Sequence, residues 1–291
     1  SQTFPQMYFK ARRAQPAFAA SGRDTTLDKK IAAVKMRDIT KRFGTVVAND
    51  RVWLDIYRGE ILALLGENGS GKTTLMKMIA GIYFPDEGQI LIDGEDVTKL
   101  PEHKRAIYLG RVFQDPMTGT AATMEIQENL ALAKRRGKRR LLAPGITKAE
   151  REEYVSLLAP LGLGLETRLT SKVGLLSGGQ RQALTLLMAT LKKPKLLLLD
   201  EHTAALDPKT AAKVLDLTET IVNRDRLTTI MITHNMRDAI LHGNRLIMMW
   251  EGRVVLDIRG EEKKHLTVND LLQQFEKASG EQFANDQALL G

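Results

Sequence analysis

Short apolar runs that end at glycine or acidic residues are the main feature of the hydrophobic pattern. Alternating or continuous apolar residues predict strands at 34–39, 45–57, 60–65, 88–92, 106–113, 196–199, 228–233, 245–250 and 253–258. The last two strands flank Glu251-Gly252, which is typical of a hairpin turn. Runs such as 60–65 and 196–199 are apolar throughout, which indicates strands of a buried parallel sheet.

Apolar residues three and four positions apart predict helices between and after these strands. The expected helices are 73–80, 125–136, 148–161, 178–192 and 208–223, and a last one capped by Thr267 with Val268, Leu271, Leu272 and Phe275 on one face. Three of them fall within about 116–192, where no strand is predicted. We therefore expect a helical lobe inserted into an α/β core.

The same pattern divides the chain into three parts. Residues 1–32 are polar, alanine-rich and without periodicity, which predicts a poorly ordered N-terminal arm. Residues 33–258 would form one domain, and 259–291 a C-terminal helical extension. We find no internal repeat, so a single domain accounts for most of the chain.

A glycine-rich loop follows the predicted strand 60–65 and opens the helix 73–80. The loop, Gly66-Glu67-Asn68-Gly69-Ser70-Gly71-Lys72-Thr73, has the spacing G-x-x-x-x-G-K-T. Its glycines allow successive backbone N–H groups to approach phosphate oxygens at a helix N-terminus. Lys72 would add a charge for the β- and γ-phosphates, and Thr73 a hydroxyl for Mg²⁺. An accidental glycine turn is the alternative, which the strand–loop–helix context disfavours.

Two further segments place polar groups at the ends of apolar runs. The strand 196–199 ends in Asp200-Glu201, where Asp200 could hold Mg²⁺ and Glu201 could polarise an attacking water; a solvated acidic turn is the alternative. Ser177-Gly178-Gly179-Gln180 opens the helix 178–192, with Ser177 as a good N-cap and two glycines that leave backbone N–H groups bare. Alone it would be a capped helix start, but it could form a second anion site.

The order of these motifs resembles the nucleotide-binding subunit of ABC transporters. The matching features are the phosphate loop, Gln114 after a strand, Leu176-Ser177-Gly178-Gly179-Gln180, the run ending in Asp200-Glu201, Ala205-Leu206-Asp207, and His234 after a strand. They span about 33–258. The resemblance implies a phosphate-loop NTPase core of RecA-like α/β fold, with an antiparallel β subdomain and an inserted helical lobe.

The resemblance also implies a head-to-tail dimer that sandwiches two ATP molecules. ATP would contact Gly66, Glu67, Asn68, Gly69, Ser70, Gly71, Lys72, Thr73 and Thr74 of one copy and Ser177, Gly178, Gly179 and Gln180 of the other. Gln114 would contact Mg²⁺ or the attacking water, His234 the γ-phosphate, and Asp207 would tie the two sites together. Phe43 is at the position of an aromatic that stacks on adenine, although a core phenylalanine is also possible.

One position departs from the family pattern, because His202 follows Glu201 where proline is usual. His202 could be a bystander, a hydrogen-bond partner of Glu201 or a γ-phosphate contact. We favour the bystander interpretation.

Composition bears mainly on location and partners. The chain has 291 residues, no cysteine and a formal charge of +8, and no apolar run reaches the ~18 residues of a membrane span. The absence of fused spans favours the stand-alone ATPase of an importer, at the cytoplasmic face of the inner membrane. Its partners would be a second copy, integral-membrane permease subunits and, indirectly, an extracytoplasmic solute-binding protein, but no nucleic acid. The basic run 134–140 could be a solvated helix end, or could meet lipid or the permease.

Alternatives remain for the role of the ATPase and for its solute. The segments 99–105, 110–116 and 200–210 resemble a bacterial branch that is often uncharacterised or assigned to aromatic amino acids, whereas the phosphate-loop segment is closer to sugar and nucleoside importers. A non-transport ATPase of cluster-assembly type stays open. A sensor that binds ATP without hydrolysis is disfavoured, because Lys72, Asp200, Glu201 and His234 are all present.

Overall fold

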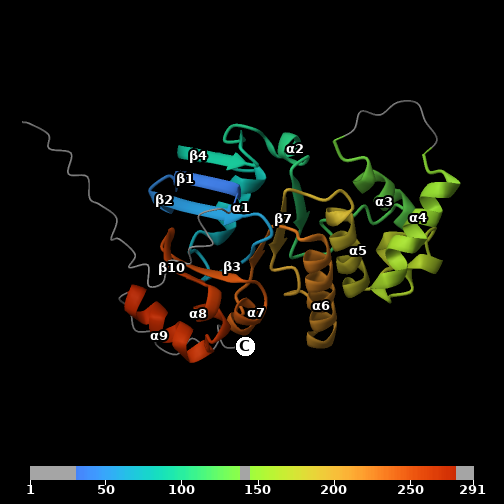
Figure 1. Ribbon diagram of the computed structural model, residues 1–291. Coiled ribbons are helices and arrows are strands. Elements are labelled where there is room, and N and C mark those ends of the chain that lie inside the picture. Colours follow the sequence, from blue (N-terminus) through green and yellow to red (C-terminus); the bar gives the residue numbers. More distant parts are fainter. Residues whose placement is uncertain (1–30, 138–144, 280–291) are drawn as a thin grey trace, which may run out of the picture. The chain divides into compact units, whose positions relative to one another are not determined.

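The computed structural model describes residues 31–137 and 145–279, which contain two sheets flanked by helices (Figure 1). Nearly all of the expected N-terminal arm and the end of the C-terminal extension lie outside these residues. A six-stranded sheet has the order β10-β9-β3-β8-β7-β6, parallel except for the β9–β10 pair. Its strands are β3 (Ile61–Gly66), β6 (Leu109–Val112), β7 (Leu196–Asp200), β8 (Thr229–Ile232), β9 (Arg245–Trp250) and β10 (Arg253–Arg259).

The second sheet has four antiparallel strands in the order β2-β1-β4-β5. Its strands are β1 (Ala32–Phe43), β2 (Val46–Tyr57), β4 (Glu87–Ile92) and β5 (Glu95–Asp96). The helices are α1 (Lys72–Ala80), α2 (Glu102–Arg105), α3 (Ile126–Lys134), α4 (Lys148–Leu158), α5 (Gly178–Thr190), α6 (Pro208–Asp225), α7 (Met236–Leu241), α8 (Gly260–Lys264) and α9 (Val268–Ser279).

The apolar run of β3 is continuous because both faces of the six-stranded sheet are covered. Leu62 and Leu64 join a buried cluster that includes α1 and apolar residues of the antiparallel sheet. Ala63 and Leu65 point to the other face, into a cluster with apolar residues of α5, α6, α7 and α9. Successive side chains of β3 therefore pack alternately into two cores, which holds β3 and the loop that follows it in place.

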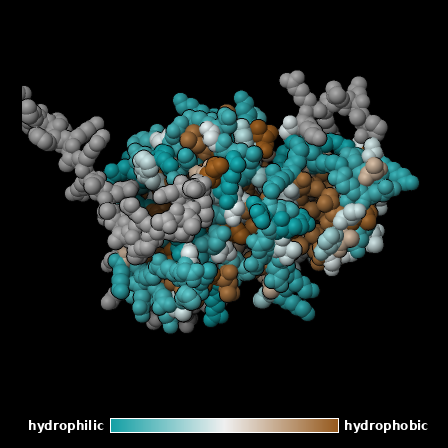
Figure 2. Space-filling view, in the orientation of Figure 1, coloured by the Kyte–Doolittle hydropathy of each residue, from teal (hydrophilic) through white to brown (hydrophobic). Residues whose placement is uncertain are grey.

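A third apolar cluster is formed by α3, α4 and α5. In Figure 1 these helices lie beside one another, at a distance from the antiparallel sheet. Figure 2 shows apolar side chains gathered over α3 and α5 on a face that is otherwise largely hydrophilic. Both α4 and α5 begin with a capping box, at Thr147/Glu150 and Ser177/Gln180, which explains why they start where they do.

Most expected elements are confirmed, including the 245–258 hairpin and the helix capped by Thr267, but the strand expected at 106–113 is about half as long as predicted. Residues 106–108 form turns in which Ala106 N–H donates to Glu102 O and Tyr108 N–H to Arg105 O, so β6 begins only at Leu109. The short elements β5, α2, α7 and α8 carry too little periodicity to be predicted. Within the described residues no helix combines the length and apolarity needed to cross a membrane.

Candidate nucleotide site

The glycine-rich loop connects the buried end of β3 to the first turn of α1. Gly71 is the N-cap of α1 at φ +97°, and a Cβ there would lie 2.4 Å from Ala48 O. A Cβ on Gly66 would lie 2.5 Å from Met249 O. Only glycine allows such close backbone packing, so these positions set the curvature of the loop. The bare N–H groups at the start of α1 provide the partial positive charge that an anion needs.

Neighbouring segments support the loop from outside. The Gly252 N–H donates to Ser70 O at 3.1 Å, and the Asp50 N–H donates to Gly252 O at 3.0 Å. The buried Asn49 amide donates to Gly71 O at 3.3 Å. The β9–β10 turn and the middle of β2 thus hold the loop in place. No sequence pattern indicates this role for Asn49 or Asp50, and only the turn Glu251-Gly252 is predicted from its residues.

The Lys72 ammonium group lies inside the curve of the loop. It donates to Gly66 O, to Glu67 O at 2.7 Å and to Ser70 Oγ at 3.4 Å. Lys72 is 5% exposed, and burial lowers the pKa of its ammonium, although Glu201 and Glu67 oppose the shift. A buried cation surrounded by loop carbonyls and N–H groups is suited to a polyanion.

Asp200 ends β7, next to β6 in the same parallel sheet. Burial raises the pKa of the Asp200 carboxyl, and Arg111, whose Nη2 lies 3.8 Å from Asp200 Oδ2, opposes the shift. Arg111 also stacks on Phe113, with 4.4 Å between its Cζ and the ring centroid. No sequence pattern indicates this role of Arg111, because its position beside Asp200 depends on the pairing of β6 with β7.

Glu201 and His234 come together from different strands. Glu201 Oε2 lies 3.5 Å from His234 Nδ1, and the Glu201 N–H donates to Ile232 O at 3.1 Å. Glu201 has φ +44°, a left-handed backbone conformation that is rare for a residue with a side chain and is often found at functional sites. The structure therefore brings together the two residues that the sequence analysis assigned to hydrolysis.

Gln114 follows β6 and shares a cleft with Asp200. The cleft is open and is lined by Phe113, Gln114, Asp115, Thr118, Asp200 and Ala205. Thr73 is exposed in the first turn of α1. The described residues contain no group of three or more His, Asp or Glu that could hold a metal by themselves. This donor set fits Mg²⁺, which is commonly held by one carboxylate, a hydroxyl and substrate phosphates.

The signature segment 176–180 opens α5 in the helical lobe. Ser177 Oγ accepts the Gln180 N–H at 3.3 Å, and Gln180 Oε1 accepts the Ser177 N–H at 3.1 Å. The Gln180 amide also donates to Leu163 O at 3.1 Å, so its side chain is already engaged. Ser177 and Gly178 are exposed. Within residues 31–137 and 145–279, no hydrogen bond joins this segment to the phosphate loop of the same chain.

The remaining candidate residues lie around this centre. Asp207 is exposed and caps α6, accepting the Thr210 N–H at 3.1 Å. Phe43 is 44% exposed and contacts Tyr83 edge-on at 5.3 Å between ring centroids, so it is not a core residue. Thr74 is half-buried in α1.

His202 and the basic run have local partners. His202 is only 2% exposed, and its Nε2 is engaged with Thr218 Oγ1 on α6 at 3.1 Å, which disfavours the γ-phosphate contact. In the basic run, Lys134 and Arg135 pair with Glu153 and Glu150, and Arg136 donates to Lys192 O. Residues 138–140 lie outside the described part.

Comparisons with known proteins agree with this geometry. The family model described as "ABC transporter" matches residues 49–204. A tyrosine transport ATP-binding protein of Clostridioides difficile is 46% identical over 225 residues, 77% of this chain and 89% of that protein. A methionine import ATP-binding protein of Rhizobium johnstonii is 36% identical over 76% of this chain, which spans only 59% of that relative.

A solved structure shows the same fold in a dimer. The ATP-binding cassette MJ0796, in a dimeric post-hydrolysis state bound to ADP and Pi, has a TM-score of 0.66 and 28% identity over 78% of this chain and 98% of its own. The expected fold class is thus confirmed: a phosphate-loop core, an antiparallel β subdomain and a helical lobe. These matches also favour transport over the cluster-assembly alternative. The chain belongs to the ABC transporter family and is an ATP-binding cassette of importer type, an ATPase coupled to transport.

Proposed function

We propose that two copies of this chain close head to tail on two ATP molecules and hydrolyse them to power solute uptake through a permease. The observation that carries the proposal is the Glu201–His234 pair, 3.5 Å apart, on the sheet whose strand β3 leads into the phosphate loop. The negative charge of Glu201 also acts on the phosphate-binding cation, because it opposes the lowering of the Lys72 pKa by burial. A base, a positioned histidine and a phosphate cradle form a hydrolytic centre.

Each candidate residue has a role in this centre. The loop from Gly66 to Thr74 and the Lys72 ammonium hold the phosphates. Thr73, Asp200 and Gln114 would hold Mg²⁺, which neutralises phosphate charge when bound. Glu201 polarises the attacking water, and His234 orients Glu201 and the γ-phosphate. The exposed ring of Phe43 stacks on adenine.

The signature segment acts on the nucleotide of the other copy. Ser177 and Gly178 are exposed at the N-terminus of α5, so the Ser177 hydroxyl and the Gly178 N–H can donate to the γ-phosphate of a facing copy. The Gln180 side chain acts indirectly, because its capping hydrogen bonds fix Ser177. Asp207 lies at the start of α6, where the facing copy would approach. ATP bound between the copies stabilises the dimer, and hydrolysis releases it.

The decisive experiment replaces Glu201 with glutamine. Glu201→Gln should lower kcat by about 100-fold or more, because general-base catalysis contributes roughly that much. It should retain ATP and form a stable ATP-dependent dimer in size-exclusion chromatography. The matched control is Glu261→Gln on the surface of α8, whose side chain is 77% exposed. Normal turnover by Glu201→Gln would remove this carboxylate from the mechanism.

The membrane partner and the solute follow from family membership. We place the chain at the cytoplasmic face of the membrane through a permease, and an extracytoplasmic binding protein would deliver the solute. Met117, three residues after Gln114, is 53% exposed and provides apolar surface for the permease near the cleft. The relative that carries tyrosine in its name supports an aromatic amino acid as the solute.

Purification from membranes tests this assignment. A polytopic partner should accompany the chain, and vesicles that contain both should take up labelled tyrosine faster than labelled methionine when ATP and the binding protein are supplied. Purification with soluble scaffold proteins alone would overturn the transport role. Equal or slower tyrosine uptake would overturn the solute assignment but not the ATPase.

A further inference from the structure

His202, directly after Glu201, is anchored to the helix that follows it. Its Nε2 lies 3.1 Å from Thr218 Oγ1, in the third turn of α6. Within the loop 201–207, His202 is the one buried residue, since the others are half-buried or exposed. The imidazole is therefore the main side-chain attachment between this loop and the body of α6.

The direction of this hydrogen bond can be deduced from the partners of Thr218. The Thr218 hydroxyl has one hydrogen, which it donates to Val214 O at 2.7 Å. Its oxygen must therefore accept from His202, so the proton is on Nε2. Burial, with a smaller contribution from His242, lowers the pKa of His202 to about 4, in agreement with a neutral ring. The bond is directional, from a neutral imidazole to a threonine oxygen.

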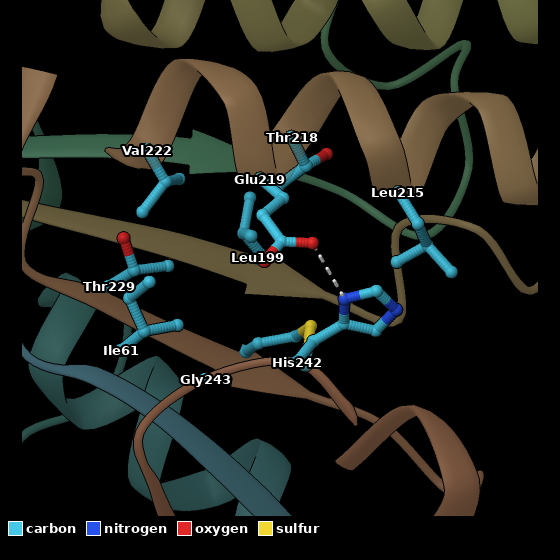
Figure 3. A pocket seen from close by; sticks show the side chains of 10 residues that line it. Ile61, Leu199, Leu215, Thr218, Glu219, Val222, Thr229, His242 and Gly243 are labelled. Carbon is cyan, nitrogen blue, oxygen red and sulfur yellow. Dashed lines mark ion pairs between the residues drawn. The ribbon is translucent and has the colours of Figure 1, made fainter. Parts of the chain in front are cut away.

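The surroundings favour this contact. Figure 3 shows Thr218 on α6 above a small pocket lined mainly by apolar side chains, including Leu199, Leu215 and Val222. The neighbouring Glu219 points to His242, with 3.5 Å between Glu219 Oε2 and His242 Nδ1. Both partners of the His202–Thr218 bond are buried, and burial strengthens a hydrogen bond and makes its loss more costly.

The backbone of the loop explains why an anchor is needed. Glu201 has φ +44°, and Ala204 N–H donates to Glu201 O at 2.9 Å in a tight turn. Such a conformation persists only where its surroundings impose it. On the upstream side, Glu201 N–H is held by Ile232 O, and on the downstream side the buried side chain is that of His202.

We propose that His202 is a positioning residue for Glu201: by donating its Nε2–H to Thr218, it fixes the loop on α6 and holds the Glu201 carboxylate toward His234. The inference rests on the proposed role of Glu201 as the base. Where the family usually carries proline, whose ring stiffens the backbone, this chain stiffens the same position through a side-chain bond. The same hydrogen bond links the loop of Glu201 to α6, the helix capped by Asp207. The proposed base and the proposed dimer contact at Asp207 are therefore both held by α6.

The test varies both ends of the bond. Thr218→Val keeps the shape but removes the acceptor, and His202→Leu removes the donor. Each should lower kcat by about 10-fold or more with KM for ATP unchanged, because small displacements of a catalytic group reduce rate more than binding. Thr218→Ser and His202→Gln retain an acceptor and a donor, and should restore kcat to within about 3-fold of wild type.

Thr220→Val provides the matched control, because Thr220 is exposed on the same helix and its hydroxyl likewise bonds the carbonyl four residues before, Asp216 O, at 2.8 Å. It should leave kcat unchanged. All assays belong below the melting temperature of every variant, measured in parallel. Wild-type kcat in Thr218→Val would overturn the proposal. An equal loss in Thr218→Val and Thr218→Ser would also overturn it, by showing a packing effect.

Glu201→Gln, assayed beside these variants, distinguishes a failure of the positioning role of His202 from a failure of the assignment of Glu201 as the base. If it is inactive while Thr218→Val is normal, only the positioning role fails. If Glu201→Gln hydrolyses ATP normally, the assignment of the base fails and the positioning role fails with it.

Discussion

Replacing Arg105 with methionine should destabilise the fold strongly, although Arg105 lies in a helix of only four residues. Its guanidinium is fully buried and donates to Met78 O at 2.5 Å, Leu100 O at 2.7 Å, Ile79 O at 2.9 Å and Thr98 O at 3.0 Å. Two of these carbonyls belong to the last turn of α1, where Met78 O also accepts the Gly81 N–H at 3.3 Å. The Arg105 side chain therefore completes the cap of the helix that begins at Lys72.

The size of the effect follows from two opposing terms. Loss of the charged donor leaves buried carbonyls without this partner, at a cost of about 1–3 kcal/mol each. Against this, methionine avoids the cost of burying a charge, the same cost that lowers the pKa of Arg105 to about 10. With a side chain of similar volume filling the space, we expect a net loss of about 3 kcal/mol in the free energy of unfolding.

Urea unfolding at neutral pH, followed by circular dichroism, measures this loss as a lower midpoint at constant slope. The control is Arg58→Met, whose ion pair with Asp93 involves an arginine side chain that is 55% exposed, and it should change stability by less than about 1 kcal/mol. A loss below about 1 kcal/mol for Arg105→Met would refute the reasoning, because it would mean that water or a backbone shift satisfies the four carbonyls.

Two further outcomes follow from the structure. Arg245 holds Asp257 through two bonds of 2.7 Å; burial raises the pKa of Asp257, but the bonds from Arg245 outweigh it and lower the pKa overall. This stabilisation is complete above the ordinary carboxyl pKa and is lost as pH falls through the lower folded pKa, so melting temperatures measured from pH 7 to 3 should fall less steeply in Asp257→Asn. Gly252→Ala should weaken ATP binding by about 10-fold in fluorescence titration, because its Cβ would lie 2.8 Å from Ala48 O and push the turn off the phosphate loop. Gly59→Ala, at nearly the same φ with nothing within 4 Å, should lose stability but keep ATP affinity, and equal affinity losses in both would contradict the steric argument.

The sequence predicts those parts of the site in which neighbours in the chain are also neighbours in space. The β3–loop–α1 unit is of this kind, since Gly66, Lys72 and the helix start are all local. The spacing of Ser177 and Gln180 is also typical of a capping box, which the structure contains. The resemblance instead implied that Gln180 contacts the nucleotide.

The remainder depends on pairings that no local pattern encodes. Arg111 meets Asp200 only because β6 pairs with β7 in the observed register. The strand expected at 106–113 was too long because Arg105 turns into the core and draws the following residues into turns. His202 was interpreted as a bystander because its partner, Thr218, is sixteen residues away on a helix face that the sequence alone cannot orient.

Because the Gly252 turn supports the phosphate loop, it affects when a newly made chain becomes able to bind nucleotide. The Gly252 N–H donates to Ser70 O, across more than half of the sequence, and Gly252 and Gly71 both accept hydrogen bonds from the middle of β2. During synthesis the whole phosphate-loop motif is therefore present long before the complete nucleotide site can form, since contacts of high sequence separation form late. Nucleotide binding therefore requires that the chain has been synthesised through β9 and β10. Bound ATP would slow hydrogen exchange in this distant hairpin as much as in the loop itself.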